Sequence, residues 1–410
     1  MHFYTQTSSP VSSTIAAISF SGSNAEAPLE LFGIDGVETL EQYCAGGYHP
    51  VMIGDVLHER YRIVDKFGCG GYSTVWLAHD THLEKYVAVK VGIADSAEHE
   101  AKVLRALSVP SQSSSTPLGR NSIPILLDEF KLSGPNGIHP CYTTPPARGD
   151  LKDMSANRLF PLAIARALLA GLVLAIAYVH SRGYVHDGIH LRNVLAKLPN
   201  AIQQRDGHPL PPNISEKAVV PLYLGIDAQD FTSLDAHIIL SDFGEAFAPD
   251  VEARRGEDCH TPFRKTIIGG DFITADEVVS QHIEVLGPMP VEWWDRWTER
   301  GRFFDATGNP LPDREDVWPP LSGGFEQNVQ KFRRKRNIGE FGEEETAAIL
   351  DLMRRMLKFR PGERLTADQV LQSEWMLKWA LPAFHQLGYR KDKRHHSPDL
   401  EHFSYFSSQS

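Results

Sequence analysis

Short segments near the start of the sequence carry residue types suited to binding phosphate groups. Residues 68–75 form a glycine-rich run. Its glycines, Gly68, Gly70 and Gly71, would leave backbone N–H groups open to a phosphate. A helix after such a run would indicate a dinucleotide-binding turn, but β-branched and aromatic residues follow and predict a second strand. Lys90 ends an apolar strand behind this turn, so the two features together predict a phosphate-binding site.

A carboxylate on the next predicted element would hold the Lys90 ammonium in place. Glu100 lies on a helix predicted over residues 96–106, with the side-chain direction needed to pair with Lys90. Glu98 on the neighbouring face is the competing partner. Register favours Glu100, because Leu104 one turn later then faces the core.

Oxygen ligands for a metal ion occur further along the chain. The apolar run over residues 238–241 leads into Asp242-Phe243-Gly244 and would deliver the Asp242 carboxylate to a magnesium ion. Asn193 would supply a second oxygen ligand. The glycine-rich run, the lysine, the glutamate and the aspartate follow one another in the order of a phosphoryl-transfer site, so chance matches to all of them are improbable.

The elements that must position these residues divide the chain into a strand-rich part and a helix-rich part. Strands are predicted over residues 61–67, 74–78, 86–91, 125–130 and 139–144, with a loop over 108–123. Helices are predicted over residues 161–182, 344–358 and 366–380. Residues 1–42 show no sustained period and predict a mobile tail. The layout predicts an α+β fold.

Composition sets broad limits on the kind of protein. The 410 residues are 42% hydrophobic, which suffices for one large domain or two. A net charge of -11 argues mildly against nucleic acid as a partner and permits basic peptides. The four cysteines are scattered without metal-site spacing, as expected for structural thiols in a reducing compartment. No positive charge precedes Arg60, so we expect neither a secretory signal nor a transit peptide, and an intracellular location.

One apolar stretch resembles a membrane span in composition. It covers residues 162–178, which is shorter than the roughly 20 residues that a span needs. It also contains Arg166. A buried core helix is therefore the prediction, and a membrane-associated or purely structural protein is the alternative from another class.

Longer motifs connect the chain to a known family. Residues 43–55 read YCAGGYHPVMIGD, residues 67–77 read FGCGGYSTVWL, and residues 132–139 read LSGPNGIH. In these segments the chain resembles eukaryotic protein kinases, and among them the SR-protein kinases. The resemblance implies a bilobal α+β fold, with a small strand-rich N-lobe over about 43–146, a larger mainly helical C-lobe over about 147–384, and a tail over 385–410.

The same resemblance implies roles for further residues. ATP and Mg²⁺ would be the cofactors, and Ser73 stands in place of the third glycine. The residues lining the adenine would be Val75, Ala88 and Leu195, and the stacked residues of the regulatory column would be Leu104, His186 and Phe243. The expected partners are ATP and a basic, Arg/Ser-rich protein, with no direct nucleic acid and no membrane. A monomer in the cytoplasm, the nucleus or both is expected.

The loop over residues 186–193, which reads HDGIHLRN, departs from the family pattern. Gly188 stands where the catalytic aspartate would be, five residues before the asparagine. Asp187 is one residue early, and whether it substitutes as the base stays open, because successive side chains point in different directions. His190 stands where a lysine near the γ-phosphate is usual. Loss of a general base costs on the order of 10²- to 10⁴-fold in rate.

Two functions therefore remain in view. One is a serine/threonine kinase of the SR-protein-kinase type that transfers the γ-phosphate of Mg·ATP to protein Ser or Thr. The other is a pseudokinase that binds nucleotide or basic Arg/Ser-rich partners with little or no transfer. Because phosphoryl transfer relies mainly on positioning and charge neutralisation, slow transfer without the base is compatible with the first.

A second departure follows the predicted activation segment. In protein kinases a long apolar helix of the C-lobe follows the activation segment. Here residues 262–270 are followed almost directly by residues 273–290, which resemble the kinase sequence after that helix. This predicts a deletion and an incomplete C-lobe, with reduced stability. Residues 275–278 (ADEV) would be a degenerate closing motif. Arg364 matches the arginine that pairs with the closing glutamate, so either Glu277 is recruited or Arg364 turns outward.

Residues 291–343 are rich in aromatic and charged residues. Their tryptophans are expected to pack against the lobe. The basic run over residues 331–336 is expected to be a solvated surface, with a nuclear signal as the alternative.

Overall fold

The computed structural model describes residue 38 and residues 40–94, 96, 98–110, 117–156, 159–198, 222–249, 274–314 and 317–392. The segment predicted over 262–270, nearly all of the predicted N-terminal tail and the chain beyond residue 392 lie outside these ranges. The chain divides into two compact units. The first comprises residues 1–101, 125–146 and 200–224, and the second comprises residues 102–124, 147–199 and 225–410.

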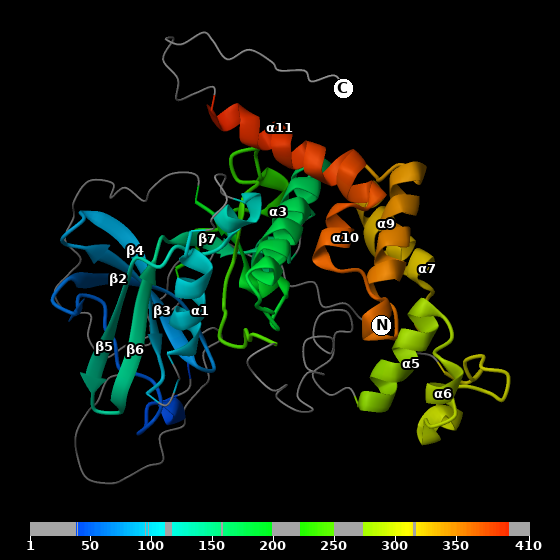
Figure 1. The fold of residues 1–410 in the computed structure, drawn as a ribbon, viewed down its shortest axis with the longest axis horizontal. Coiled ribbons are helices and arrows are strands. Elements are labelled where there is room, and N and C mark those ends of the chain that lie inside the picture. Colours follow the sequence, from blue (N-terminus) through cyan, green and yellow to red (C-terminus); the bar gives the residue numbers. More distant parts are fainter. Residues whose placement is uncertain are drawn as a thin grey trace. The chain divides into compact units, whose positions relative to one another are not determined.

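The first unit is built on an antiparallel sheet. Among the described residues the sheet has six strands in the order β1-β2-β3-β4-β6-β5. Figure 1 labels β2 to β6 of this sheet. The strands are β1 (Val56–Leu57), β2 (Tyr61–Gly70), β3 (Ser73–Asp80), β4 (Lys85–Gly92), β5 (Asp128–Gly134) and β6 (Gly137–Thr144). The predicted strands are confirmed, although β5 begins at Asp128 rather than at residue 125. The sequence missed β1, because two residues are too few to show a period.

Side-chain alternation separates two faces of this sheet. The buried face forms the core of the unit with Ile63, Trp76, Ala78, Val87, Val89, Val91 and Phe130. On the other face, Val75 lies opposite Lys90 in the β3–β4 register. Ala88 follows on that face at the position two residues before Lys90. The register therefore places predicted adenine-binding and phosphate-binding residues on one face.

The helix α1 (His99–Ser108) carries the chain from the first unit into the second. Its C-terminal part and the 3₁₀ helix η2 (Leu118–Ser122) belong to the second unit. Tyr178 donates a hydrogen bond to the Leu107 carbonyl at 2.5 Å, and a Cβ on Gly119 would lie 2.0 Å from the Leu174 carbonyl oxygen. The predicted N-lobe over 43–146 is thus interrupted, because residues 102–124 pack on a helix of the second unit.

The second unit is mainly helical, as predicted. It contains a three-stranded antiparallel sheet within the described residues, formed by β7 (Ala147–Asp150), β8 (Val194–Lys197) and β9 (Ile238–Leu240). Its helices are α2 (Leu151–Met154), α3 (Leu162–Ser181), α5 (Ala275–Leu286), α6 (Val291–Trp294), α7 (Leu321–Phe325), α8 (Lys331–Lys335), α9 (Glu343–Met356), α10 (Ala367–Leu371) and α11 (Leu381–Asp392). The strand-rich and helix-rich layout of an α+β fold is confirmed.

The C-terminal helices differ from prediction in their limits. The helix predicted over 366–380 is α10, followed by a π-helical turn, η9 (Met376–Ala380), which runs directly into α11. Short turns elsewhere in this unit are η3 (Leu191–Asn193), η4 (Ala228–Asp230), η6 (Thr298–Arg302), η7 (Glu326–Gln330) and η8 (Pro361–Glu363). The helix α11 extends to Asp392, past the predicted domain end at residue 384.

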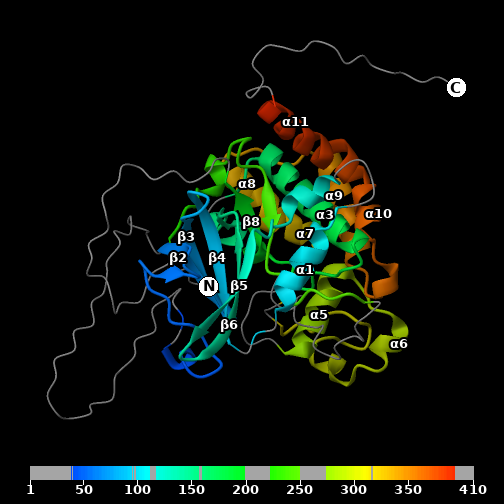
Figure 2. The same ribbon diagram turned by 60° about the vertical axis from the view of Figure 1, so that its left-hand side comes forward.

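The helix α3 lies in the interior of the second unit. It contacts α10, α11 and β9. Figures 1 and 2 show α3 together with α10 and α11. Among the described helices it alone is long and apolar enough to cross a membrane, but Ala167, Ala170 and Ala175 are fully buried by protein. Arg166 forms a two-pronged ion pair with Glu345 of α9, at 2.8 and 2.5 Å. These contacts fit the predicted core helix.

The aromatic region after α5 packs on itself. Trp294 and Trp297 lie against Phe303 and Phe304, with ring centroids 5.5–6.0 Å apart. The predicted packing role of these tryptophans is confirmed. The prediction of a solvated basic run is wrong for Arg333, which is 3% exposed and donates to the carbonyls of Phe160, Ile338 and Gly339.

Candidate functional site

The glycine-rich run forms a tight hairpin in the first unit. Gly70 pairs with Ser73 across the β2–β3 register, so Gly71 and Tyr72 form the turn. No atom lies within 4 Å of the place where a Cβ would stand on Gly68, Gly70 or Gly71. None of these glycines has a positive φ. Neither the backbone conformation nor close packing therefore requires glycine at these positions. The absence of side chains leaves the backbone of the hairpin open to a ligand.

Lys90 and Glu100 form an ion pair in the first unit. The Lys90 ammonium lies 2.7 Å from Glu100 Oε2, and the side chains are 18% and 13% exposed. The competing carboxylate, Glu98, pairs with Lys131 at 2.6 Å instead. The Lys90 ammonium also lies 6.0 Å from the centre of the Tyr142 ring, which borders it on the neighbouring strand. The helix register thus selected the correct glutamate.

The loop over residues 186–193 in the second unit is held by hydrogen bonds through its backbone. The Gly188 N–H donates to His186 Nδ1 at 3.2 Å, and the Gly188 carbonyl accepts from the Asn193 amide at 2.9 Å. His186 is 1% exposed, and its Nε2 lies 3.0 Å from the Ser241 carbonyl oxygen. A carbonyl only accepts, so Nε2 carries the proton and Nδ1 is the acceptor.

His186 also joins the loop to the Asp-Phe-Gly segment. Its ring centroid lies 4.6 Å from that of Phe243, which is fully buried, as is Leu104. The Ser241 N–H donates to the Asn193 carbonyl at 2.8 Å. The loop and the segment after β9 are therefore one packed assembly.

Gly188 occupies a position with room for a side chain. A Cβ there would meet Asn193 Nδ2 at 3.5 Å and His186 Nδ1 at 3.6 Å, which are ordinary van der Waals contacts. Its φ lies outside the left-handed region. Neither close packing at the Cβ position nor backbone conformation therefore demands glycine here.

Asp187 has an unusual backbone conformation, with φ at +58°, which aspartate tolerates better than most residues. Burial raises the pKa of its carboxyl group, and the nearby Glu245 carboxylate raises it further. Asp187 is therefore a better proton acceptor than an exposed aspartate. The structure places it beside Glu245, and position 188 stays without a carboxylate.

The His190 imidazole lies half-buried near several charged groups. Burial lowers its pKa; Asp242 and Asp150 oppose that effect, while Arg192 and Lys152 add to it. The net pKa is below the ordinary value of about 6.5. His190 is therefore neutral at pH 7 and does not supply the positive charge that a lysine would carry.

The predicted metal ligands, Asn193 and Asp242, lie at one end of the β8–β9 strand pair. Val194 is opposite Leu240, and Asn193 precedes this pair as Ser241 and Asp242 follow it. Asn193 uses its amide nitrogen on Gly188, which leaves its carbonyl oxygen as the donor atom. A carboxylate and an amide oxygen are donors that Mg²⁺ accepts, so the two residues fit the ion. No cluster of three or more His, Cys, Asp or Glu that could hold a metal occurs in the part of the chain that the structure describes.

Leu195, the predicted adenine contact of the second unit, lies on β8 opposite Ile239. It is half-buried, next to the strand end that carries Asn193. Position and exposure are compatible with a contact to a flat apolar ligand.

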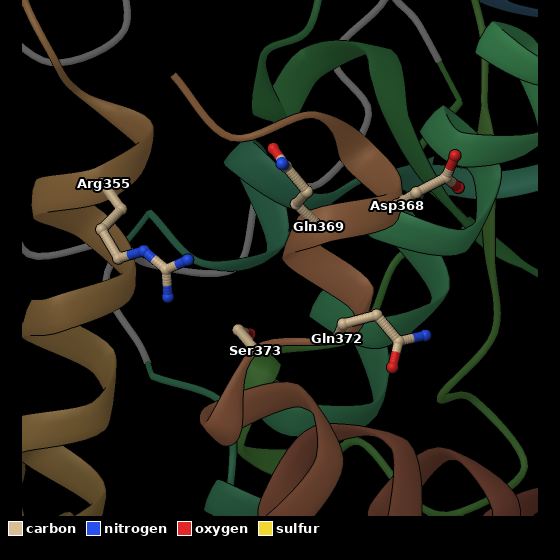
Figure 3. A pocket seen from close by; sticks show the side chains of 5 residues that line it. All are labelled: Arg355, Asp368, Gln369, Gln372 and Ser373. Carbon is tan, nitrogen blue, oxygen red and sulfur yellow. The ribbon is translucent and has the colours of Figure 1, made fainter. Parts of the chain in front are cut away.

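A hollow of about 290 Å³ lies elsewhere in the second unit (Figure 3). Arg355 reaches into it from α9, and the other lining residues are Asp368, Gln369, Gln372 and Ser373. None of these residues belongs to the predicted site. The Arg355 guanidinium is 3.6 Å from Asp351 on its own helix, so its charge is partly compensated.

The predicted closing motif has a different local role. Residues 275–278 form the first turn of α5, where Thr274 and Glu277 close a capping box. Arg364 donates to the carbonyls of Lys358 and Phe359 at 2.7 and 3.3 Å. Glu277 therefore stabilises the start of a helix, a use that the Thr274 and Glu277 spacing signals in the sequence.

The contacts that attach the glycine-rich hairpin to the segment before the sheet carry no signal in the sequence pattern. Tyr48 donates a hydrogen bond to the Gly70 carbonyl at 2.6 Å, and the buried Lys66 forms an ion pair with Glu38. Lys66 follows an irregularity in the β2–β3 register that lies just before Asp65. Such a bulge reverses the inward and outward alternation, so strand period alone could not reveal that Lys66 is buried.

Comparison with known proteins identifies relatives but no matching family model. The chain is 25% identical over 384 residues to a serine/threonine protein kinase of Aspergillus fumigatus, covering 83% of this chain and 90% of the relative. It is 33% identical over 192 residues to SRSF protein kinase 3 of Homo sapiens, covering 43% of this chain and 33% of the relative. Protein kinase dsk1 of Schizosaccharomyces pombe is 36% identical over 167 residues, covering 38% of this chain and 30% of the relative. The last two matches thus span about a third of those proteins.

Proposed function

Because this chain is an SR-protein-kinase-like protein kinase by homology, we propose that it binds Mg·ATP and transfers the γ-phosphate slowly to Ser or Thr of a basic, Arg/Ser-rich protein. The ion pair between Lys90 and Glu100 is the observation that carries this proposal. A lysine held in this way offers a fixed positive charge to phosphate oxygens. The open hairpin over residues 68–73 and the half-buried Val75 and Ala88 support it.

The proposal assigns binding roles to residues within each unit. In the first unit, Lys90 would neutralise phosphate charge, the hairpin amides would cradle the phosphates, and Val75 and Ala88 would contact the adenine. In the second unit, Leu195 would contact the adenine, and Asn193 and Asp242 would hold Mg²⁺ through oxygen atoms. When bound, the ion would neutralise the charge that develops on the phosphate oxygens.

The transfer step would proceed without a carboxylate at position 188. Gly188 offers only backbone atoms, and both its N–H and its carbonyl are used within the loop. The substrate hydroxyl would then lose its proton without a general base at that position, which lowers the rate by about 10²- to 10⁴-fold. Positioning and charge neutralisation remain, and these account for most of the catalysis of phosphoryl transfer.

A transfer assay tests the proposal. The full chain is incubated with Mg·ATP labelled in the γ-phosphate and an Arg/Ser-rich peptide, and the Lys90→Met variant is compared with Lys131→Met. Lys131 is a matched control, because it also pairs with a glutamate but is 64% exposed. We expect slow transfer that Lys90→Met abolishes and Lys131→Met leaves unchanged. Transfer that persists in Lys90→Met would contradict the proposed role of this lysine.

The second candidate function is that of a pseudokinase, and Gly188 is the observation that favours it. Such a protein would bind nucleotide or a basic partner without transfer. Stabilisation of the fold by Mg·ATP, measured as a rise in melting temperature, together with no labelled peptide would support this function over the first. Absence of any stabilisation by Mg·ATP would contradict both.

A further inference from the structure

The segment that precedes the sheet forms hydrogen bonds and an ion pair with the first strand of the glycine-rich hairpin. We call residue 38 and residues 40–55 the leading segment. Tyr48 of this segment donates a hydrogen bond to the Gly70 carbonyl at 2.6 Å. Glu38 forms an ion pair with Lys66, and a hydrogen bond joins Glu38 to the Cys69 thiol. The attachments thus reach several successive parts of the hairpin strand.

The ion pair between Glu38 and Lys66 is buried. The Lys66 side chain is 1% exposed and the Glu38 side chain 3% exposed. Burial acts to raise the pKa of Glu38, but hydrogen bonds from Lys66 and Tyr43 outweigh it and the net pKa is lowered, so Glu38 is ionised. The Lys66 ammonium also lies 5.4 Å from the centre of the Trp76 ring. Both charges are compensated only while the leading segment is docked, so the pair defines one docked position.

Tyr48 holds a peptide group at the turn of the glycine-rich hairpin. The peptide between Gly70 and Gly71 is planar and trans, so its carbonyl and its N–H point in opposite directions. The Tyr48 hydroxyl fixes the direction of the Gly70 carbonyl and therefore also that of the Gly71 N–H. Tyr48 is itself 3% exposed, so its hydroxyl has little freedom to move.

We propose that the leading segment is a strut that orients the glycine-rich hairpin for nucleotide phosphates, with Tyr48, Glu38 and Lys66 as its positioning residues. This inference rests on the proposed function, because it assigns phosphate binding to the hairpin. A strut that holds the hairpin amides in place lowers the ordering cost of binding, so phosphate affinity depends on it. Affinity for the nucleoside does not, since adenosine has no phosphate to contact the hairpin.

The test compares two ligands on variants of the full chain. Dissociation constants for Mg·ATP and for adenosine are measured by calorimetry on the wild type, Tyr48→Phe and Glu38→Gln. We expect Tyr48→Phe to weaken Mg·ATP binding by about fivefold, the effect of one hydrogen bond of ordinary strength, and to leave adenosine binding unchanged. Glu38→Gln is made together with Lys66→Met, so that no buried ammonium is left uncompensated. It should weaken Mg·ATP binding at least as much and provides a second variant if Tyr48→Phe fails to fold.

Tyr61→Phe is the matched control. Tyr61 is a fully buried tyrosine of β2 whose hydroxyl donates to Asp128 Oδ2 at 2.5 Å, away from the hairpin. Its loss should lower the melting temperature and leave the ratio of the two affinities unchanged. The proposal is wrong if the ratio of the Mg·ATP and adenosine dissociation constants is the same as in the wild type in both variants. That result includes the case in which both ligands lose affinity equally. A wild-type chain that does not bind Mg·ATP refutes the proposed function instead.

Discussion

The glycine-rich hairpin and the loop around Gly188 differ in what the surrounding structure contributes to their chemistry. The hairpin is secured by side chains from outside it, namely Tyr48 and the pair of Glu38 and Lys66. The loop is secured through its own backbone, because the Gly188 N–H and carbonyl bind His186 and Asn193. The first region retains the groups that would bind phosphate, whereas the second retains its shape without the group that would accept a proton. Shape and chemistry are therefore separable in the loop.

The largest test of this difference restores the missing carboxylate. Because a Cβ at position 188 would make only ordinary van der Waals contacts, we expect Gly188→Asp to raise the rate of transfer to an Arg/Ser-rich peptide by about 10²- to 10⁴-fold. The dissociation constant for Mg·ATP should change little. Steady-state kinetics of the variant measure both quantities.

Gly188→Asn is the control for this substitution, because asparagine has nearly the same size and cannot act as a base. It should leave the rate at the wild-type level. If Gly188→Asp is no faster than Gly188→Asn, the loop lacks more than its base, and the separation of shape from chemistry fails.

A second test addresses the region that retains its groups. Glu100→Gln removes the charge that holds the Lys90 ammonium, so we expect Mg·ATP to bind about tenfold more weakly, as for the loss of a charge-assisted hydrogen bond. Glu98→Gln is matched in chemistry and lies on the same stretch of chain, but it pairs with Lys131. Calorimetric titration should show a clear loss for Glu100→Gln and none for Glu98→Gln. Equal effects would show that the register of α1 does not matter for binding.

A third test measures how the stability contributed by His49 of the leading segment depends on pH. His49 packs edge-on against the fully buried His139, with ring centroids 4.7 Å apart, and His49 Nδ1 and His139 Nε2 have no hydrogen-bond partner. Burial lowers the pKa of His49 below about 6.5, the proximity of His139 lowers it further, and Asp55 opposes both effects. Below about pH 6.5 the unfolded chain then binds more protons at this residue than the folded chain does. Stability should therefore fall as the solution is acidified through that value.

The measurement is the melting temperature at pH 7.5 and at pH 5.5 for the wild type and His49→Phe. Because other groups also titrate, the difference between the two proteins is the relevant quantity. We expect the acid-induced drop to be smaller by about 3 °C in His49→Phe, which has no imidazole to protonate. The same drop in both proteins would show that His49 does not control this dependence of stability on pH.

The smallest expected effect concerns the neighbour of Gly188. Asp187 lies beside Glu245 in a left-handed backbone conformation, so we expect Asp187→Asn to leave the residual transfer rate within about twofold, far below the effect of losing a general base. A loss of a hundredfold or more would identify Asp187 as the substitute base. In that case the general base of the loop would lie one residue earlier than in the family pattern.

Much of this structure was predictable from the sequence because it depends on local periods and short motifs. The strand pattern predicted β2, β3 and β4, and helix register selected Glu100 over Glu98. Each of these inferences uses neighbours that are close in the sequence or lie on one face of one element.

The remainder depends on contacts between distant residues. Lys66 and Arg333 are charged, so the sequence predicts them at the surface, and each is buried only because distant groups compensate it. The assignment of residues 102–124 to the second unit depends on Tyr178. The extension of α11 beyond residue 384 likewise has no local signal in the sequence. Long-range partners of this kind leave no period in the sequence.

The buried pair of Glu38 and Lys66 affects how the protein can be shortened for experiments. The family likeness begins at residue 43, which makes that residue an obvious starting point for a shortened recombinant protein. It would lack the carboxylate that compensates the Lys66 ammonium, which is 1% exposed. Stranding a buried charge in this way costs several kcal/mol, typically about 3 to 5. A chain trimmed at residue 43 should therefore be recovered mainly as insoluble protein, whereas one that keeps residue 38 should not.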